Sequence, residues 1–460
     1  MNETINAKYK FRIEPEDILS DYQAIARMVE EHKGLKPRFD KLWRYYRGDH
    51  AIKEQVKKSD WVPNAQVANP YPAYITDTQV GYFLGSPVVY TSDNEPLIDQ
   101  LTGINDYNDE QSHNLELARA MSIVGYAYEV LYFDADKNIR MVKLPGDEVF
   151  LVYDKSLENR VVYGVRYYDE ELADGDKQAV IIIYDTENIA TFRQSKADGS
   201  LILDEVENHG FGDVPINKYV NNEEETGDFE KVIPLIDAYD KVESNTLDDM
   251  DMFTDAYLHL KNMAGTKPED LQQVRETRTI LTVEDGDAEW LVKSVNDSWV
   301  ENFKNRLDKD IHKFSFTPNL ADENFAGNQS GVAIRYKLLG LEQARSIKER
   351  GFKRGLQRRI EMICHHLGML GAGAFDYLDV QLHFNNSLPQ NVVEITQIIT
   401  GLRDMLPEET LLSLLPFVED PKAEIDKREK EKEEAADKLY TRYSGGDLND
   451  QEKEEVYKDA

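Results

Sequence analysis

The spacing of apolar residues predicts two helices in the first 125 residues. Residues 15–47 predict one helix, because Pro15 suits a first turn and Gly48 supplies a stop after the last turn. Residues 109–124 predict a second helix, which ends at Gly125. The segment between them, residues 60–90, predicts loop and short extended pieces because proline recurs there. These prolines are Pro63, Pro70, Pro72 and Pro87.

The period then changes from helical to extended. Residues 126–220 are rich in Val, Ile and Tyr, in runs such as YAYEVLYFD, RVVYGVRYYD and AVIIIYD. This composition and its alternation predict an antiparallel sheet. Ala135–Asn138 separate the first two runs and predict the turn of a hairpin.

A long helix is predicted over residues 231–262, with one apolar stripe at helical spacing. The stripe consists of Met250, Phe253, Tyr257 and Leu260. The other faces carry acids: Asp237, Asp240, Glu243, Asp248, Asp249, Asp251 and Asp255. Seven acids against two lysines, Lys241 and Lys261, leave a net charge of −5, so we expect an acidic surface along this helix.

A small α+β module is predicted between this helix and the next. Thr266 and Glu269 have the spacing of a capping box for a short helix, and Asp285-Gly286 predicts a hairpin turn between two strand-like runs. Ser298 and Glu301 repeat the capping-box spacing and begin another helix. Its apolar stripe is Val300, Phe303, Leu307 and Ile311. We expect the two long helices to pack side by side beneath the module.

Residues 315–330 have no periodicity and predict a loop that is long for a folded chain, and such a loop is usually either functional or disordered. A third long helix is predicted over residues 331–367, and it is basic. Its nine cations are Arg335, Lys337, Arg345, Lys348, Arg350, Lys353, Arg354, Arg358 and Arg359, against Glu342 and Glu349. One interpretation is a stripe that binds nucleic acid. We favour neutralisation of nearby acids, because Leu338, Leu341, Phe352 and Leu356 on the same helix require burial.

The C-terminal part begins with YLDVQLHFN, which alternates like a strand. Helical segments are predicted over residues 391–418. Residues 419–440 carry dense charge of both signs, typical of a solvated helix with i,i+4 pairs, although a coiled-coil arm is an alternative. Residues 441–460 predict a mobile tail.

The overall charge limits the possible functions. The 460 residues include 87 acidic and 54 basic side chains, which give a net charge of −33. Such an excess opposes a surface that grips phosphate backbones, so any role with DNA is one of guiding rather than tight binding. Hydrophobic residues make up 41%, enough for a packed core. We find neither a signal-peptide pattern nor an apolar run long enough to span a membrane, and we expect a soluble protein made in a reducing cytoplasm.

Candidate chemistry is weak throughout the chain. Cys364, His365 and His366 are neighbours on a predicted helix, and adjacent helical side chains point about 100° apart, so they do not converge on one metal ion. The glycines that follow them come after a helix instead of a strand, so they do not match a dinucleotide loop. A metal-dependent nuclease would seat its acids around a pocket, whereas the densest acids here lie along one helix. We therefore expect no catalytic residue, no metal, no cofactor and no enzymatic activity.

Several tracts, in this order, resemble the portal proteins of tailed bacteriophages, especially the siphophage type from Gram-positive hosts. They are DTQVGYFLGSPVVY from Asp77, GYAYEVLYFD from Gly125, FGDVPINKYVNN at 211–222 with the GDFEKVIPLIDAYDKVESNTLDDMDMFTDAYL that continues it, TPNLADENFAGNQSGVAIRYKLLGLE at 317–342 and FKRGLQRRIEMI at 352–363. The resemblance covers residues from about 20 to 415. None of these tracts is an active-site fingerprint, and their order along the chain carries the resemblance.

The resemblance implies an α+β portal fold. Residues 1–230 would form a wing of helices and antiparallel sheet. Residues 231–262 and 299–314 would be paired stem helices, and 263–298 a small α/β clip. Residues 315–330 would be the tunnel loop. The rest would be a long wing helix with a strand (331–388), a helical crown (389–440) and the mobile tail (441–460).

The resemblance also implies a role and partners. Typically twelve subunits would form a ring at one capsid vertex, assembled in the host cytoplasm, through which double-stranded DNA is packaged and ejected. The partners would be a terminase, head-completion or adaptor proteins, the scaffold and the major capsid protein. The alternatives are an acidic virion head-assembly protein and a DNA-mimic binding protein.

The resemblance further implies which residues meet the DNA. In the tunnel loop, Asp322 and Glu323 would repel phosphate, while Asn319, Asn324 and Phe325 would make weak, slidable contacts. The acidic stem face would be formed by Asp248, Asp249, Asp251 and Asp255. An acidic wall suits a channel for a moving polyanion, because each Lys–phosphate contact would hold the DNA back.

Overall fold

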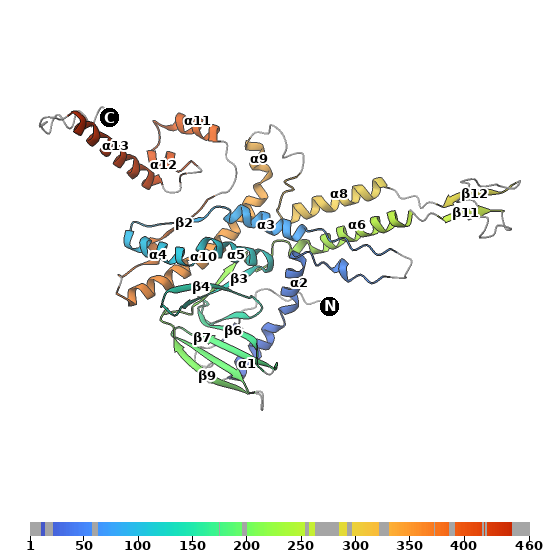
Figure 1. The fold of residues 1–460 in the computed structure, drawn as a ribbon, viewed down its shortest axis with the longest axis horizontal. Coiled ribbons are helices and arrows are strands. Elements are labelled where there is room, and N and C mark those ends of the chain that lie inside the picture. Colours follow the sequence, from blue (N-terminus) through green and yellow to red (C-terminus); the bar gives the residue numbers. More distant parts are fainter. Residues whose placement is uncertain are drawn as a thin grey trace.

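The computed structural model combines helices with mainly antiparallel sheets in one elongated molecule (Figure 1). It describes residues 11–13, 22–57, 63–173, 175–195, 200–253, 257–262, 285–291, 297–321, 331–371, 373–385, 392–415, 418 and 421–443. Two long helices, α6 and α8, project from the rest of the molecule, which we call the body, and a small β pair lies at their far end. The α+β fold class is therefore confirmed at this level.

Helices of the first 125 residues pack around the body, and they correct two predictions and add one helix that was not predicted. Their bounds are α1 Tyr22–Lys33, α2 Lys36–Tyr46, η1 Ala51–Glu54, α3 Tyr71–Leu84, α4 Glu95–Tyr107 and α5 Glu110–Val124. The single helix predicted over 15–47 is wrong, because the chain turns at Gly34 between α1 and α2. The loop and short extended pieces predicted over 60–90 are confirmed over 63–70 and from Val88, where a short strand begins. They are wrong over α3, since Pro70 and Pro72 fall at its cap and first turn, where proline is tolerated. The sequence pattern missed α4.

The predicted sheet region is confirmed as two sheets. One has the order β1-β5-β6-β7-β8-β9, antiparallel except for the parallel pair β1–β5, and the other has the order β10-β3-β4. The strands are β1 Phe11–Arg12, β3 Tyr126–Phe133, β4 Ile139–Leu144, β5 Val149–Tyr153, β6 Val161–Glu171, β7 Lys177–Tyr184, β8 Asn188–Gln194, β9 Leu201–Asn208 and β10 Ile216–Val220. Strands β3 and β4 form the predicted hairpin. The predicted end of α5 at Gly125 is confirmed, with φ of 96°.

The helix predicted over 231–262 is shorter than expected. Helix α6 runs from Ile233 to Phe253 after the short turn η2 Glu230–Val232. Strand β11, Tyr257–Lys261, then pairs with β12, Asp287–Leu291. Tyr257 and Leu260 therefore lie on a strand, because backbone pairing with β12 overrides the helical spacing of the side chains. The structure returns through α8, Asp297–Phe314, as predicted.

The basic helix is bent into two pieces. Helix α9 covers Gly331–Lys337, and α10 covers Leu339–Met369 after a break at Leu338. Helix α10 lies against β10 at close range. A Cβ on Gly351 would come within 2.1 Å of the Val220 carbonyl oxygen, and a Cβ on Gly355 within 2.4 Å of the Tyr219 ring. Both glycines thus allow the close approach, and the residues that directly follow them, Phe352 and Leu356, are fully buried.

The C-terminal part is helical, as predicted, after a short strand. Strand β13, Gln381–Phe384, follows the turn η4 Tyr377–Asp379 and pairs with β2, Val88–Thr91. The helices are α11 Val392–Leu402, α12 Glu408–Leu412 and α13 Pro421–Tyr443. The predicted tail beyond residue 443 lies outside the described residues. Across the described chain, none of the helices combines the length and apolarity that a bilayer crossing requires.

Candidate functional site

The helices α6 and α8 lie side by side, as the sequence predicted, and we call them the helical pair (Figure 1). Lys304 of α8 reaches across to Glu243 of α6, with Nζ 2.9 Å from the carboxylate, and this bond raises the pKa of Lys304. Near the body, Ile236 of α6 and Ile311 of α8 are fully buried in one core. The pair is therefore anchored by apolar contacts at its base and by an ion pair further out.

The far end of the pair carries the β11–β12 strands. Tyr257 lies opposite Leu291, and Lys261 lies opposite Asp287. The Asn262 side chain donates to the Asp285 carbonyl at 3.1 Å. Asp285 has a left-handed φ of 65°, which suits a turn, but the first strand of the hairpin predicted around it lies outside the described residues. The remainder of the predicted 264–298 module lies outside the described residues.

Three acids on α6 bind neighbouring segments instead of forming an open surface. Asp237 accepts a hydrogen bond from the Tyr45 hydroxyl at 2.7 Å. Asp240 is fully buried, and its carboxylate lies 2.6 Å from Nδ1 of His50. Asp248 accepts from the Ala65 backbone N–H at 2.6 Å. Asp240 therefore adds nothing to the acidic surface expected along this helix, while Asp237 and Asp248 are half-buried.

The other predicted acids have different outcomes. Asp249 is half-buried and Asp251 is exposed near the far end of α6. Asp255, together with the Phe253 side chain of the predicted apolar stripe, lies outside the described residues. Met250 of the same stripe is 60% exposed, so this outer part of α6 leaves apolar surface uncovered within one chain.

The start of the predicted loop 315–330 is fixed by helix α3. Tyr74 donates to the Pro318 carbonyl at 2.9 Å and accepts from the Leu320 backbone N–H at 2.9 Å. The Gln79 side chain donates to the carbonyl of Ser315 at 2.8 Å and to the hydroxyl of Thr317 at 3.0 Å. These bonds tie residues 315–320 to the body.

Irregular backbone over 315–321 agrees with the loop prediction. Phe316 has φ of 58°, a left-handed conformation that is uncommon for a bulky residue, and its side chain is exposed. Asn319 lines a depression beside Tyr74 and His312. The other predicted channel residues lie outside the described residues. They are Asp322, Glu323, Asn324 and Phe325.

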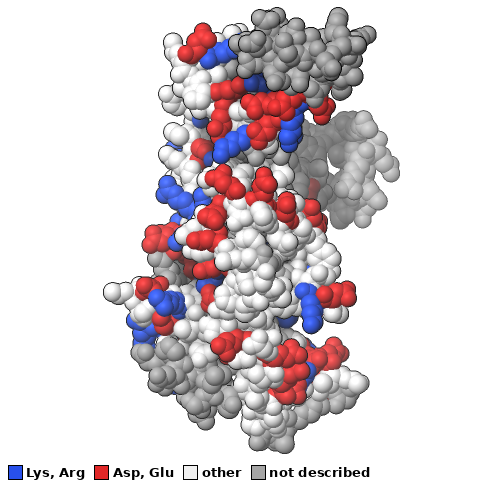
Figure 2. All heavy atoms as spheres, turned by 90° about the vertical axis from the view of Figure 1, so that its left-hand side faces the viewer, with Lys and Arg blue, Asp and Glu red and all other residues white. Residues whose placement is uncertain are grey.

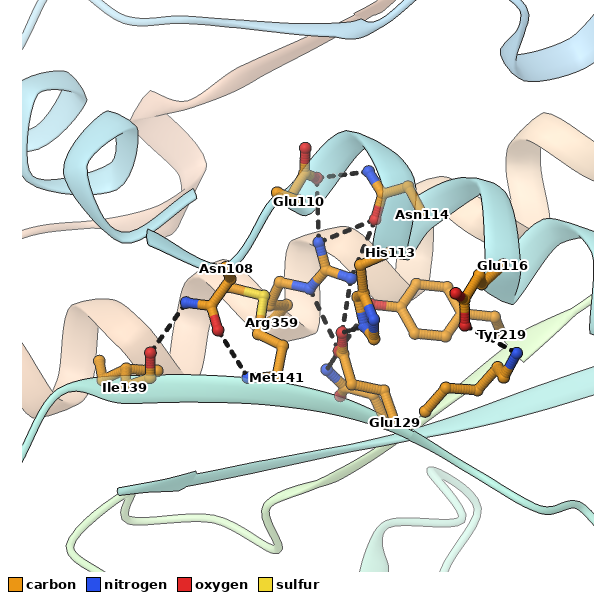
Figure 3. Close-up of polar contacts among 12 residues, drawn as sticks. Asn108, Glu110, His113, Asn114, Glu116, Glu129, Ile139, Met141, Tyr219 and Arg359 are labelled. Carbon is orange, nitrogen blue, oxygen red and sulfur yellow. Dashed lines mark hydrogen bonds and ion pairs between the residues drawn. The ribbon is translucent and has the colours of Figure 1, made fainter. Parts of the chain in front are cut away.

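A buried polar cluster joins α10 to the body (Figure 3). The Arg359 guanidinium donates to both oxygens of Glu129, at 2.6 and 3.1 Å, to Glu110 at 3.0 Å and to Asn114 at 3.0 Å. Glu129 also accepts from His113, Asn217 and Tyr219. Burial favours the neutral form of Glu129, but the charges and hydrogen bonds of Arg359 and His113 together outweigh it and lower the pKa of that carboxyl.

Other cations of α10 are also paired within the chain. Lys348 is buried and donates to Asp228 at 2.5 Å and to Ser122 at 2.7 Å, while its burial lowers the pKa of its ammonium. Arg345 bridges to Glu342 and Glu349, and Arg358 to Asp213. The four apolar residues predicted to require burial on this helix are all buried. The neutralisation reading is therefore confirmed for these cations.

The residues Cys364 and His366 of the Cys-His-His sequence take part in packing against the rest of the chain. Cys364 is buried, which raises the pKa of its thiol to about 11. Nδ1 of His366 lies 3.3 Å from the Gly210 carbonyl, and burial lowers its pKa. In the part of the chain that the structure describes, no three His, Cys, Asp or Glu side chains are grouped to hold a metal ion.

The surface opposite the helical pair carries both signs of charge. Figure 2 shows acidic side chains gathered in several patches, with lysines and arginines scattered among them. On this face the described residues form no continuous basic track, which is what a phosphate-binding groove would require.

Comparison with known proteins gives consistent matches. Residues 25–438 match the family described as "Phage portal protein, SPP1 Gp6-like". The portal protein of Bacillus phage SPP1 is 25% identical, and the match covers 95% of this chain and 90% of that protein. The portal protein of Clostridium phage phiCD119 is 24% identical over 379 residues, which cover 77% of this chain and 82% of the relative.

Proposed function

The chain belongs to the SPP1 Gp6-like family of phage portal proteins, and on this premise we propose which of its elements form the DNA channel. The helical pair is the stem, and the β11–β12 strands with the residues between them are the clip. The observation that carries this assignment is the projection of α6 and α8 from the body, with a small β pair at the tip (Figure 1).

The remaining parts follow from their position around the pair. Residues 1–230 form the wing, to which α9, α10 and β13 add, and the helices from α11 to α13 form the crown. Residues 315–330 form the tunnel loop, because they connect the inner end of α8 to α9 and start from a fixed base on α3.

The assembly we propose is a ring, typically of twelve copies, at one capsid vertex. The exposed apolar side chains of the helical pair support contacts between copies. Met250 on α6 and Trp299 on α8 are 60% and 64% exposed, and Trp299 stacks on Phe303. A neighbouring stem would cover this surface. Double-stranded DNA passes through the ring, and the subunit itself performs no catalysis.

Partners are assigned by position in the assembly. The terminase motor and, later, the head-completion or adaptor proteins dock on the clip, because it is the outermost tip of the stem. The scaffold and the major capsid protein contact the wing. Assembly takes place in the host cytoplasm before the ring becomes part of the virion.

The tunnel-loop assignment is tested by reversing charge in the loop. Replacing Asp322 and Glu323 with lysine would place two cations per subunit at the constriction. Each contact between a lysine and a phosphate strengthens DNA binding and makes the affinity fall more steeply as salt rises. We therefore expect normal rings that package DNA more slowly, with the larger defect at low salt. The matched control is the double Asn/Gln variant, which removes charge without adding cations. Equal packaging rates for wild type and the double-lysine variant at both salt concentrations would contradict the assignment.

A further inference from the structure

The connection between α2 and α3 runs beside α6, where it is drawn in blue (Figure 1). Residues 63–70 of this connection form neither a helix nor a strand, and we call them the strap. Three backbone N–H groups of the strap donate to side chains of α6. Ala65 bonds to Asp248 at 2.6 Å, Val67 to Ser244 at 3.0 Å and Asn69 to Asp240 at 2.8 Å.

The spacing of the two segments explains why all three bonds form together. Alternate residues of an extended chain are about 6.6 Å apart. Residues four apart on an α-helix are about 6.0 Å apart along its axis. Because Ala65, Val67 and Asn69 alternate along the strap while their partners are spaced by four along α6, the N–H groups match the side-chain oxygens one by one.

The inner end of this ladder is buried. Asp240 and Ser244 have no exposed surface. Asp240 also accepts from the Asn69 side chain at 2.9 Å, and it faces Nδ1 of the fully buried His50 at 2.6 Å. The second ring nitrogen of His50 lies 3.1 Å from the Tyr45 carbonyl oxygen. Each polar group at this end therefore has a partner, as a permanent contact requires.

The alternate residues of the strap bond in the other direction. The side chains of Asn64 and Gln66 both donate to the Gln55 carbonyl, at 3.1 and 2.9 Å. Gln55 in turn donates to Asn64 at 3.0 Å. The side chains of Asn64 and Gln66 thus bond within the connection, while the N–H groups of the odd-numbered strap residues bond to α6.

We propose that the strap fixes α6 in position on the body, and that Asp240, Ser244 and Asp248 are positioning residues of the stem. This inference rests on the proposed role of α6 as a stem helix. Sliding α6 along its axis by half a turn would leave all three N–H groups without an acceptor, so the strap holds the height and tilt of α6 while DNA passes. The carboxylate of Asp248 then serves as a hydrogen-bond acceptor for the strap and not as part of the repulsive channel wall.

Amide hydrogen exchange on the full-length protein tests the ladder, with Asp248→Ala and Asp248→Asn as the informative pair. Asparagine keeps an acceptor oxygen but removes the charge, whereas alanine removes both. We expect alanine to speed exchange of the Ala65 amide about tenfold, the effect of losing one hydrogen bond of typical strength, and asparagine to restore most of the protection. Asp310→Ala on α8 is the control for charge, and it should leave the strap amides unchanged. Unaltered exchange in Asp248→Ala, or no recovery in Asp248→Asn, would overturn the proposal.

DNA packaging with the same variants links the ladder to the channel. A positioning role predicts that asparagine recovers most of the packaging rate that alanine loses. Equal losses in both variants would assign Asp248 to the charge of the channel wall and would overturn the positioning role. The exchange measurement requires neither a ring nor DNA, so its failure is distinguishable from a failure of the channel assignment.

Discussion

Replacing Arg359 with methionine tests the buried cluster that joins α10 to the body. The guanidinium makes five hydrogen bonds to three residues, two of which are the carboxylates Glu110 and Glu129. Without the guanidinium, Glu129 keeps its hydrogen bonds to His113, Asn217 and Tyr219 but loses the buried positive charge of Arg359. Breaking one side of a buried ion pair costs about 3 to 5 kcal/mol, because the remaining charge stays away from water.

That loss is large compared with a total stability of about 5 to 15 kcal/mol for a folded domain. Urea unfolding of the subunit, followed by circular dichroism, measures it. Arg354→Met on the exposed side of the same helix is the matched control, and its change should stay within about 0.5 kcal/mol. Arg359→Lys should recover only part of the loss, because an ammonium lacks the planar fork that reaches both carboxylates. A loss below about 1 kcal/mol in Arg359→Met would refute the reasoning.

Three further variants test other parts of the body. Burial lowers the pKa of His32 to about 4, so the histidine is neutral when folded. Below pH 6.5 the unfolded chain therefore binds more protons than the folded chain, and the free energy of unfolding of wild type should fall by about 2 kcal/mol between pH 6.5 and 5 because of this group. In urea unfolding at a series of pH values, His32→Phe should remove that fall. Lys348→Met leaves Asp228 buried without its cation and should lower the free energy of unfolding by about 3 kcal/mol, while Lys348→Arg should lower it less. Gly125→Ala should lower the free energy of unfolding by about 2 kcal/mol or more and therefore lower the melting temperature. Its new Cβ would lie 2.0 Å from the Glu225 carbonyl oxygen, and the φ of residue 125, 96°, is one that alanine rarely adopts. A melting temperature equal to wild type would contradict that last expectation.

Periodicity predicted the elements whose side chains repeat over many residues. The helix α8, the β3–β4 hairpin and the basic helix were found close to their predicted positions, because each buries many of its apolar side chains and their spacing follows the secondary structure. The predicted pairing of basic residues with acids was correct for Arg345, Lys348, Arg358 and Arg359, on a helix whose large apolar residues are buried as expected.

Sequence patterns failed where distant contacts decide the structure. Prolines predicted a loop where α3 forms. The helix forms nevertheless, because proline is tolerated in a first helical turn and the rest of α3 packs against α5 and α10. The acids of α6 look alike in sequence, yet Asp248 bonds to a strap residue 183 positions away. Arg359 meets Glu110 and Glu129 from 249 and 230 positions away, a distance at which no local spacing indicates a partner.

The most direct test of the channel assignment is an averaged electron-microscopy image of the assembled protein, resolved well enough to place helices. The assignment predicts closed rings, about twelve copies of the 53.0 kDa chain, with α6 and α8 of each copy lining the central channel and β11–β12 at one end of it. Subunits that stay monomeric at high concentration and in capsid-assembly extracts, or rings with the helical pair on their outer surface, would contradict it.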